Sequence, residues 1–212
     1  MEKNTIRTGS AILLLSLGLV AHGASMLNSE KTYTTPMSEK LITLGAGCFW
    51  CVEAVFSNLN GVISVSSGYM GGHIKNPAYR EVCSGRTGHA EVVQVSFDPE
   101  IIDLAMILEV FFATHDPTTL NRQGADVGSQ YRSAIYYHEE DQRLSIDQAL
   151  IKASDEWSNP IVTEIAPATS YYVAEDYHQS YFELHGDAPY CGAVIAPKMK
   201  KFQQKYNFLM KQ

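Results

Sequence analysis

The feature that most constrains the fold of this chain is the order in which two hydrophobic periodicities alternate. Short apolar runs typical of strands occur at residues 41–44, 62–69, 91–97 and 131–137. Apolar residues spaced three and four apart, as on one face of a helix, occur at 49–59 and 101–114. The resulting order is strand, helix, strand, strand, helix, strand. It predicts an α+β protein with a β-α-β-β-α-β core.

Further segments extend this core and interrupt it. They are a third helix at 139–157, a strand at 161–165 and two short helical stretches at 175–184 and 197–206. Two long polar loops, at 70–88 and 115–130, separate core elements. Loops of this length in a compact domain are usually functional. We therefore predict a ferredoxin-like two-layer sandwich with long functional loops and a C-terminal extension.

The N-terminal residues are typical of a secretory signal. Lys3 and Arg7 precede a short apolar stretch, and small residues follow where a signal peptidase cleaves. The sequence predicts a signal peptide at 1–23, a flexible leader at 24–38 and one catalytic domain at 39–212. The apolar stretch is too short for a comfortable membrane span. We expect an exported protein, periplasmic or secreted, with no stable membrane span after cleavage.

Composition narrows the function to chemistry at cysteine. The net charge of −7 and the lack of a basic run argue against binding to nucleic acid or to an anionic membrane. Four cysteines in 212 residues are too few for a disulfide scaffold. Redox or metal chemistry is therefore the function to look for in these cysteines.

One cysteine lies where the first predicted strand turns into the first helix. Cys48 follows a glycine and precedes Phe49 and Trp50. Free backbone N–H groups at a helix start stabilise a thiolate, which is the reactive form of cysteine. An apolar wall from Phe49 and Trp50 suits a substrate with a methyl or thioether end. A free cysteine is equally often a small buried core residue.

Three kinds of chemistry fit the four cysteines. Cys48 and Cys51 form a C-x-x-C pair after a strand, as in thioredoxin-like dithiol enzymes. A zinc site would need all four cysteines, but the chain has no second closely spaced ligand pair. The third interpretation is a nucleophile with a distant resolving cysteine. A non-enzymatic module that binds a methionine-rich partner is a further alternative.

Several motifs together resemble the peptide methionine sulfoxide reductase A family. They are Gly-Cys-Phe-Trp at 47–50, Gly-His-Ala-Glu at 88–91, His-Asp-Pro-Thr-Thr at 115–119, Gln-Tyr-Arg-Ser at 130–133, Ala-Glu-Asp-Tyr-His-Gln at 174–179 and Pro-Tyr-Cys at 189–191. The resemblance covers residues 41–208 in the family's order and spacing. It implies reduction of methionine S-sulfoxide, free or in proteins, by a monomer that needs no cofactor and no metal.

The resemblance also implies roles for individual residues. Cys48 is the nucleophile that becomes a sulfenic acid, and Glu91 is the acid, which needs a raised pKa. Tyr79 and Tyr131 hydrogen-bond the sulfoxide oxygen, and Asp126 helps to orient a water. Phe49 and Trp50 hold the methyl group of the substrate. The motif histidines, His89 and His178, are expected to be structural.

Recycling is implied to use a second cysteine and a thioredoxin-like reductant. Cys191 matches the family's usual recycling cysteine, which would form a disulfide with Cys48. Many relatives have glycine where Cys51 stands, and many carry two C-terminal cysteines where this chain has Cys191 alone. We expect Cys191 to form the first disulfide, and the sequence leaves Cys51 open as a second resolving thiol. Cys83 is expected to be buried and structural.

Overall fold

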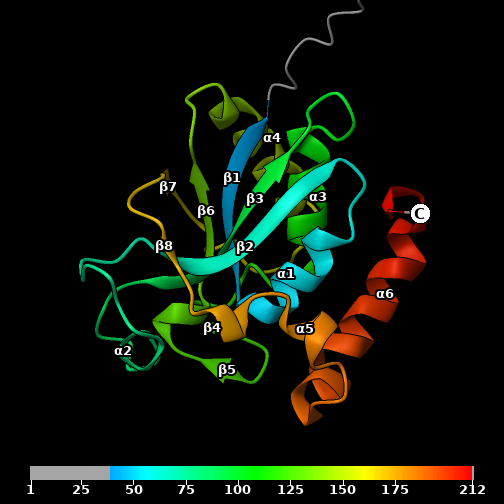
Figure 1. Ribbon diagram of the computed structural model, residues 1–212. Coiled ribbons are helices and arrows are strands. Elements are labelled where there is room, and N and C mark those ends of the chain that lie inside the picture. The colour runs from blue at the N-terminus through cyan, green and yellow to red at the C-terminus, as the bar shows by residue number, and fades with distance from the viewer. Residues whose placement is uncertain (1–38, 212) are drawn as a thin grey trace, which may run out of the picture. The chain divides into compact units, whose positions relative to one another are not determined.

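The centre of the structure is a six-stranded mixed β-sheet (Figure 1). The structure is a computed structural model that describes residues 39–211, so the predicted signal peptide and leader lie outside the described residues. The strand order is β7-β6-β1-β3-β2-β8. The strands are β1 (Lys40–Ala46), β2 (Val62–Met70), β3 (Ala90–Phe97), β6 (Ser133–Tyr137), β7 (Glu164–Pro167) and β8 (Tyr172–Val173).

Four of these strands form the predicted core with two helices. Strands β6, β1, β3 and β2 are neighbours in that order, and each pair is antiparallel. Helix α1 (Phe49–Ser57) connects β1 to β2, and α3 (Leu104–Thr114) leads from β3 toward β6. The predicted α+β class and the order of these six elements are confirmed. The outer strand β8 is antiparallel to β2, whereas β7 runs parallel to β6, which makes the sheet mixed.

The alternation of side chains along β3 determines toward which face of the sheet Glu91 points. Val93 and Val95 belong to the main core with the helices, whereas Val92 belongs to a smaller cluster of apolar residues. Successive side chains of a strand point to opposite faces, so residues of equal parity share a face. Glu91 therefore lies on the same face as Val93 and Val95, toward α1, at the start of β3.

The two predicted loops contain short elements that periodicity did not predict. The first loop holds helix α2 (Tyr79–Cys83), and the second holds the strand pair β4 (Arg122–Gln123) and β5 (Asp126–Val127). Tyr131 lies in the 3₁₀ turn η1 (Ser129–Tyr131) and does not begin a strand, because β6 starts at Ser133. These elements have two to five residues, too few for a period to be visible.

The C-terminal half adds helices around the core. Helix α4 (Gln142–Ser154) packs against α3 and is shorter at both ends than the predicted 139–157. The predicted strand 161–165 is observed three residues later, as β7. The following elements are η2 (Asp176–His178), α5 (Tyr181–Leu184), the π-helical turn η3 (Cys191–Ile195), α6 (Ala196–Tyr206) and η4 (Asn207–Leu209).

Helix α6 lies at the side of the molecule, near α1 (Figure 1). Beyond it, Met210 bridges to Leu59, and the ammonium group of Lys211 donates to the carbonyl of Ser57 at 2.8 Å. These contacts fix the segment that follows Cys191 against the helix that begins next to Cys48. None of the helices within residues 39–211 combines the length and apolar character that crossing a bilayer requires.

Candidate active site

Cys48 lies at the sharp turn between β1 and α1. The turn requires Gly47, whose φ of +90° is strained for any residue with a side chain. A Cβ at Gly47 would also lie 2.6 Å from Cγ of Gln123, so the hairpin of β4 and β5 packs directly on this turn. Cys48 is the N-cap of α1, and its side chain is half-buried.

Glu91 lies beside this helix start and is almost fully buried. Its Oε2 accepts a hydrogen bond of 3.2 Å from the backbone N–H of Phe49, while Oε1 is buried without a partner among the described residues. Burial raises the pKa of Glu91 to about 8, and the negative charges of Asp126 and Cys51 act in the same direction. At neutral pH this carboxyl group keeps its proton, and it can donate it in a water-poor site.

Two tyrosines reach the region of Glu91 from the two loops. Tyr79 opens α2, and its backbone N–H donates to Oε1 of Glu175 at 2.9 Å. Tyr131 ends η1. Burial, helped by the charge of Glu91, raises the pKa of both phenols, so both remain hydrogen-bond donors. Arg132 joins the two loops by donating to the carbonyls of Ser129 and Gly88.

Aromatic rings surround the first residues of α1. Phe49 is 1% exposed and stacks on Tyr79 with 6.4 Å between ring centroids. The indole N–H of Trp50 donates to Nδ1 of His178 at 3.2 Å, and its ring stacks on Tyr181 at 3.7 Å. The predicted apolar wall is present, although Phe49 contributes little open surface.

Cys48 and Cys51 are neighbouring thiols at the start of α1, where the backbone N–H of Cys51 donates to the carbonyl of Cys48 at 3.1 Å. The Cys51 thiol, followed by burial, raises the pKa of Cys48 well above its ordinary value. The Cys48 thiol lowers the pKa of Cys51 to about 7, and the charge of Lys198 contributes. The sequence argument expected the more acidic thiol to be Cys48. In the structure, Cys51 is the more acidic thiol of the two.

Cys191 lies near Cys51. It is fully buried in the first turn of η3, and Cys51 is the thiol whose charge acts on it. The neighbouring hydroxyl of Tyr190 donates to Asp126 Oδ2 at 3.1 Å and lies 4.0 Å from Sγ of Cys51. All four cysteines have free thiols.

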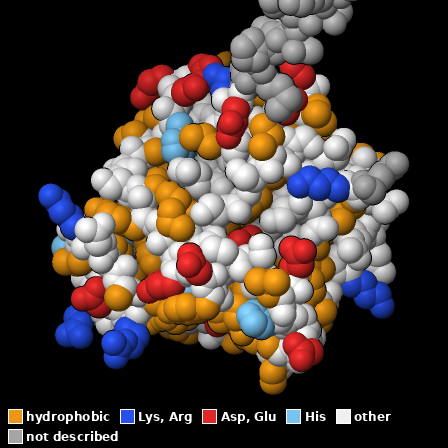
Figure 2. Space-filling view, viewed as in Figure 1, with side chains coloured by type: hydrophobic (Ala, Val, Ile, Leu, Met, Phe, Trp, Pro, Cys, Tyr) orange, Lys and Arg blue, Asp and Glu red, His pale blue; other side chains and the backbone are white. Residues whose placement is uncertain are grey.

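A small hollow of about 160 Å³ opens beside the thiol pair. Its lining residues are Ala46, Cys48, Cys51, Gln123, Gly124, Ala125, Asp126, Tyr190, Val194 and Lys198. Hydrophobic and acidic side chains lie in the lower half of the face shown in Figure 2, where Figure 1 places β4, β5 and α5. The thiol pair therefore shares a recess with Asp126 and Tyr190, and Glu91, Tyr79 and Tyr131 do not line it.

The structure brings the predicted residues into one neighbourhood, with one correction. Cys83 is exposed, not buried. In the short helix α2, Val82 points to the core and the next residue points outward. Across residues 39–211, no three His, Cys, Asp or Glu side chains are placed to hold a metal ion. The zinc interpretation thus has no ligand set in this part of the chain.

The two motif histidines differ in their surroundings. His89 accepts from the backbone N–H of Gly72 through Nδ1 and bonds the carbonyl of Ile74 through Nε2, so it supports the first loop. His178 lies among the rings of Phe49, Trp50 and Tyr79, and its buried Nε2 has no partner in the described residues. Burial lowers the pKa of His178, which keeps this ring neutral.

Sequence reasoning assigned no site role to four residues that contact the predicted site residues. They are Glu175, His178, Tyr181 and Tyr190. Three of them lie in the C-terminal motifs quoted above. Those motifs were the one sequence signal that could have pointed to them. Their contacts join positions more than 60 residues apart, and local periodicity carries no trace of such contacts.

Comparison with known proteins agrees with this arrangement. The family model described as "Peptide methionine sulfoxide reductase" matches residues 40–209. The chain is 52% identical to peptide methionine sulfoxide reductase MsrA 1 of Rhodopirellula baltica, over 81% of this chain and 90% of that one. It is also 52% identical to MsrA of Saccharolobus solfataricus, over 79% of this chain and 94% of that one.

Solved structures show the same likeness. Reduced Mxr1 from Saccharomyces cerevisiae matches with a TM-score of 0.68 and 35% identity, covering 74% of this chain and 91% of that chain. Methionine sulfoxide reductase A of Corynebacterium diphtheriae matches with a TM-score of 0.64 and 37% identity, covering 72% and 77%. The fold and the thiol site thus define a methionine sulfoxide reductase. The chain belongs to the peptide methionine sulfoxide reductase A family, whose members are peptide-methionine (S)-S-oxide reductases.

Proposed function

We propose that this protein reduces methionine S-sulfoxide, free or in proteins, through attack by Cys48. The observation that carries the proposal is the placement of Cys48 at the start of α1, beside a protonated Glu91 and next to Cys51. Cys48 attacks the sulfoxide sulfur as a thiolate, after its proton has been released to solvent. The oxygen passes from the sulfoxide to Cys48, so the substrate sulfur is reduced by two electrons and Cys48 is oxidised to a sulfenic acid.

The surrounding residues assist the departure of the oxygen. Glu91 donates its proton as charge grows on the sulfoxide oxygen, and the hydroxyl groups of Tyr79 and Tyr131 stabilise that charge by hydrogen bonds. Trp50, with the edge of Phe49, holds the methyl group. These roles follow from residue type and position: the acid is dry and protonated, and both phenols keep their protons at neutral pH.

Asp126 takes its proposed role from Tyr190. Because the Tyr190 hydroxyl donates to Asp126 and lies near Cys51, the pair can hold a water beside the thiols. Such a water would stay beside the thiols while the oxygen of the sulfenic acid leaves Cys48, as the disulfide forms.

For recycling, we propose a relay in which Cys51 acts before Cys191. Cys51 attacks the sulfenic sulfur of Cys48, and water leaves as the Cys48–Cys51 disulfide forms. Cys191 then attacks Cys51, which releases the Cys48 thiolate and leaves a Cys51–Cys191 disulfide. A thioredoxin-type reductant supplies the two electrons that open it. The support is that the charge of Cys51 acts on both other thiols and that Cys51 has the lowest pKa of the three.

The test of the function uses a small thiol reductant. Incubation of the protein with dithiothreitol and a methyl sulfoxide should yield the sulfide, with preference for the S epimer. Insulin reduction without sulfide would favour a thioredoxin-like dithiol enzyme based on Cys48 and Cys51. Binding of a methionine-rich peptide with neither reaction would favour a binding module.

We also propose the finer description of fold, organisation and location. The order β6-β1-β3-β2 with α1 and α3 supports a ferredoxin-like two-layer core within a single catalytic domain at 39–212. The N-terminal pattern supports a signal peptide at 1–23, a leader at 24–38 and export of a monomeric enzyme. N-terminal sequencing of the mature protein tests this: a start near residue 24 is expected, and a start at Met1 would contradict export by cleavage.

A further inference from the structure

Positive charge is concentrated in one segment of an acidic protein. Asp187 is the last acidic residue of the sequence, and five lysines follow it although the net charge of the chain is −7. These lysines are Lys198, Lys200, Lys201, Lys205 and Lys211. Four of the five lie on α6, so this helix presents a basic surface on an otherwise acidic molecule.

Three of these lysines form a row along one flank of α6. Met199, Phe202 and Tyr206 bury the inner face of the helix. Lys198, Lys201 and Lys205 recur at spacings of three and four, so they share one side of the helix. None of the three forms an ion pair with another residue in 39–211. We call these three residues the lysine row.

The lysine row lines a groove between α6 and the end of α3. The groove has a volume of about 390 Å³ and is lined by Ala113, Thr114, Val194, Pro197, Lys198, Lys201, Phe202, Lys205 and Tyr206. Val194 and Lys198 also line the hollow beside Cys48 and Cys51. The basic groove and the recess of the thiol pair therefore share two lining residues.

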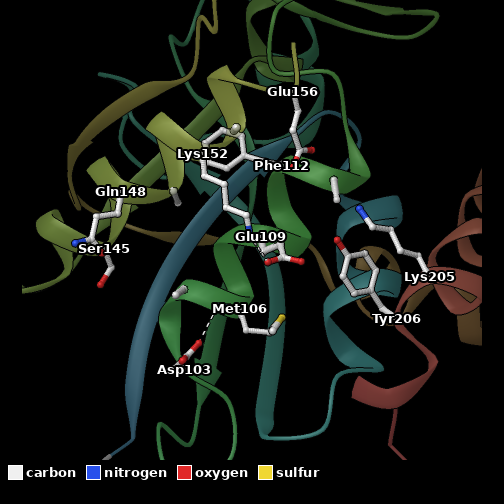
Figure 3. A pocket seen from close by; sticks show the side chains of 14 residues that line it. Asp103, Met106, Glu109, Phe112, Ser145, Gln148, Lys152, Glu156, Lys205 and Tyr206 are labelled. Atoms are coloured by element: carbon white, nitrogen blue, oxygen red, sulfur yellow. Dashed lines mark hydrogen bonds and ion pairs between the residues drawn. The ribbon is translucent and has the colours of Figure 1, made fainter.

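The far end of the lysine row meets acidic side chains. Figure 3 shows the adjoining cavity between α3, α4 and α6, where Lys205 and Tyr206 lie near Glu109 and Glu156. Glu109 is paired with Lys152 at 2.7 Å, and both glutamates act on Lys205. The charge of Lys205 is thus partly neutralised, whereas Lys198 and Lys201 supply the positive potential of the groove next to the thiols.

We propose that the lysine row is the docking surface for an acidic thiol reductant of the thioredoxin type; this rests on the proposed function. The complementary charge of such a partner would bring its dithiol to the recess of the thiol pair. The row also follows Cys191 directly, through η3, so it lies beside the thiols that hold the disulfide after each cycle. Glu91, Tyr79 and Tyr131, which the proposed function assigns to the substrate, line neither this groove nor the recess.

The physical expectation is an effect on association. Rim charges mainly steer encounter and change the association rate, and salt screens them over about 8–10 Å. Loss of one lysine from the row should therefore lower kcat/KM for the reductant and leave the chemistry at Cys48 untouched. The effect should shrink as ionic strength rises.

A matched pair of charge reversals tests the proposal in the full-length protein. Lys201→Glu removes a lysine from the groove, and Lys200→Glu makes the same change in net charge on an exposed part of α6 outside it. The probe is an acidic thioredoxin kept reduced by its NADPH-dependent reductase. At low salt, Lys201→Glu should lower kcat/KM for thioredoxin about fivefold relative to Lys200→Glu, and high salt should largely remove the difference.

Dithiothreitol separates this proposal from the function itself. With dithiothreitol as reductant, both variants should reduce the sulfoxide at the wild-type rate. If the wild-type protein itself were inactive with dithiothreitol, the proposed reductase function would be contradicted. Equal kcat/KM for thioredoxin in the two variants would overturn the docking surface while leaving the reductase intact. If Lys201→Glu lost activity only toward an acidic sulfoxide peptide, with dithiothreitol as reductant, the groove would be a substrate-binding surface. That result would also overturn the proposal.

Discussion

The two sides of Cys48 are built in different ways. On the sulfoxide side, Glu91 is held by the inner strand β3 and is hydrogen-bonded to the start of α1. On the exchange side, Cys51, Tyr190 and Cys191 meet where α1 contacts short helical turns of the C-terminal segment. The sulfoxide side keeps a proton by burial, whereas on the exchange side Cys48, with Lys198 contributing, lowers the pKa of Cys51. The comparison indicates that the Cys48 thiol lies between a buried proton donor, Glu91, and a group of exchanging thiols, Cys51 and Cys191.

The largest expected effect comes from removing the thiol that both sides share. Cys48→Ser should abolish sulfoxide reduction, a loss of roughly 10⁴-fold or more for a missing nucleophile. Sulfide formation measured by chromatography checks this, with near-ultraviolet circular dichroism as the control for folding. Full turnover by the variant would end the assignment of Cys48.

The next effect isolates the sulfoxide side. Glu91→Gln removes the proton but keeps the shape, so the single-turnover rate should fall about 10²-fold. Rapid-quench measurement of sulfide gives this rate without any recycling. Once oxidised, the variant should cycle its disulfide normally, and an unchanged single-turnover rate would remove Glu91 from the mechanism.

The exchange side is isolated by the two other thiols. Cys51→Ser should leave the first turnover intact and slow steady-state cycling with thioredoxin roughly tenfold, because Cys191 is buried away from Cys48. Cys191→Ser should still form a Cys48–Cys51 disulfide but should stall recycling with thioredoxin. Normal cycling of Cys51→Ser would instead make Cys191 the direct partner of Cys48, as the family motif suggests.

The pH dependence should differ between the two sides. Burial raises the pKa of Glu91 to about 8, so its proton is present below pH 8 and lost above it. The single-turnover rate should therefore fall as pH rises through about 8, approaching tenfold per unit. The same shift makes the folded state less stable as pH rises from the ordinary carboxyl range toward 8, because the unfolded state releases its proton earlier. Glu91→Gln should lose both dependences.

The smallest expected effect concerns a residue of the exchange side alone. Tyr190→Phe removes the hydroxyl that bonds Asp126 and helps to lower the pKa of Cys51. Alkylation of Cys51 at pH 7 should slow about threefold, while the rate of the first turnover stays within a factor of two. A large loss in the first turnover would place Tyr190 on the sulfoxide side.

Much of the sulfoxide side could be predicted from sequence, because its residues lie at features that are visible in short stretches of sequence. The strand run before Gly47 and the helical spacing after Cys48 placed Cys48 at a strand-to-helix turn, and this turn is observed. The exchange side could not be predicted in this way. Tyr190 and His178 reach the site through contacts over more than 60 residues, and short turns leave no periodic signal.

The errors have the same physical origin. Cys83 was expected to be buried because its neighbours are motif residues, yet a five-residue helix turns it outward. Tyr131 was assigned to a strand, whereas Arg132 bonds two loop carbonyls and the strand begins only at Ser133. The lowered pKa of Cys51 was also not predicted, since it depends on the neighbouring thiol and on Lys198, which follows 147 positions later.

The most direct test of the central claim is to find which sulfur receives the oxygen. The Cys51→Ser/Cys191→Ser double variant should release one sulfide per protein and should then carry one dimedone adduct, which peptide mass spectrometry should locate on Cys48. An adduct on Cys83, or sulfide release without any adduct on Cys48, would contradict the account.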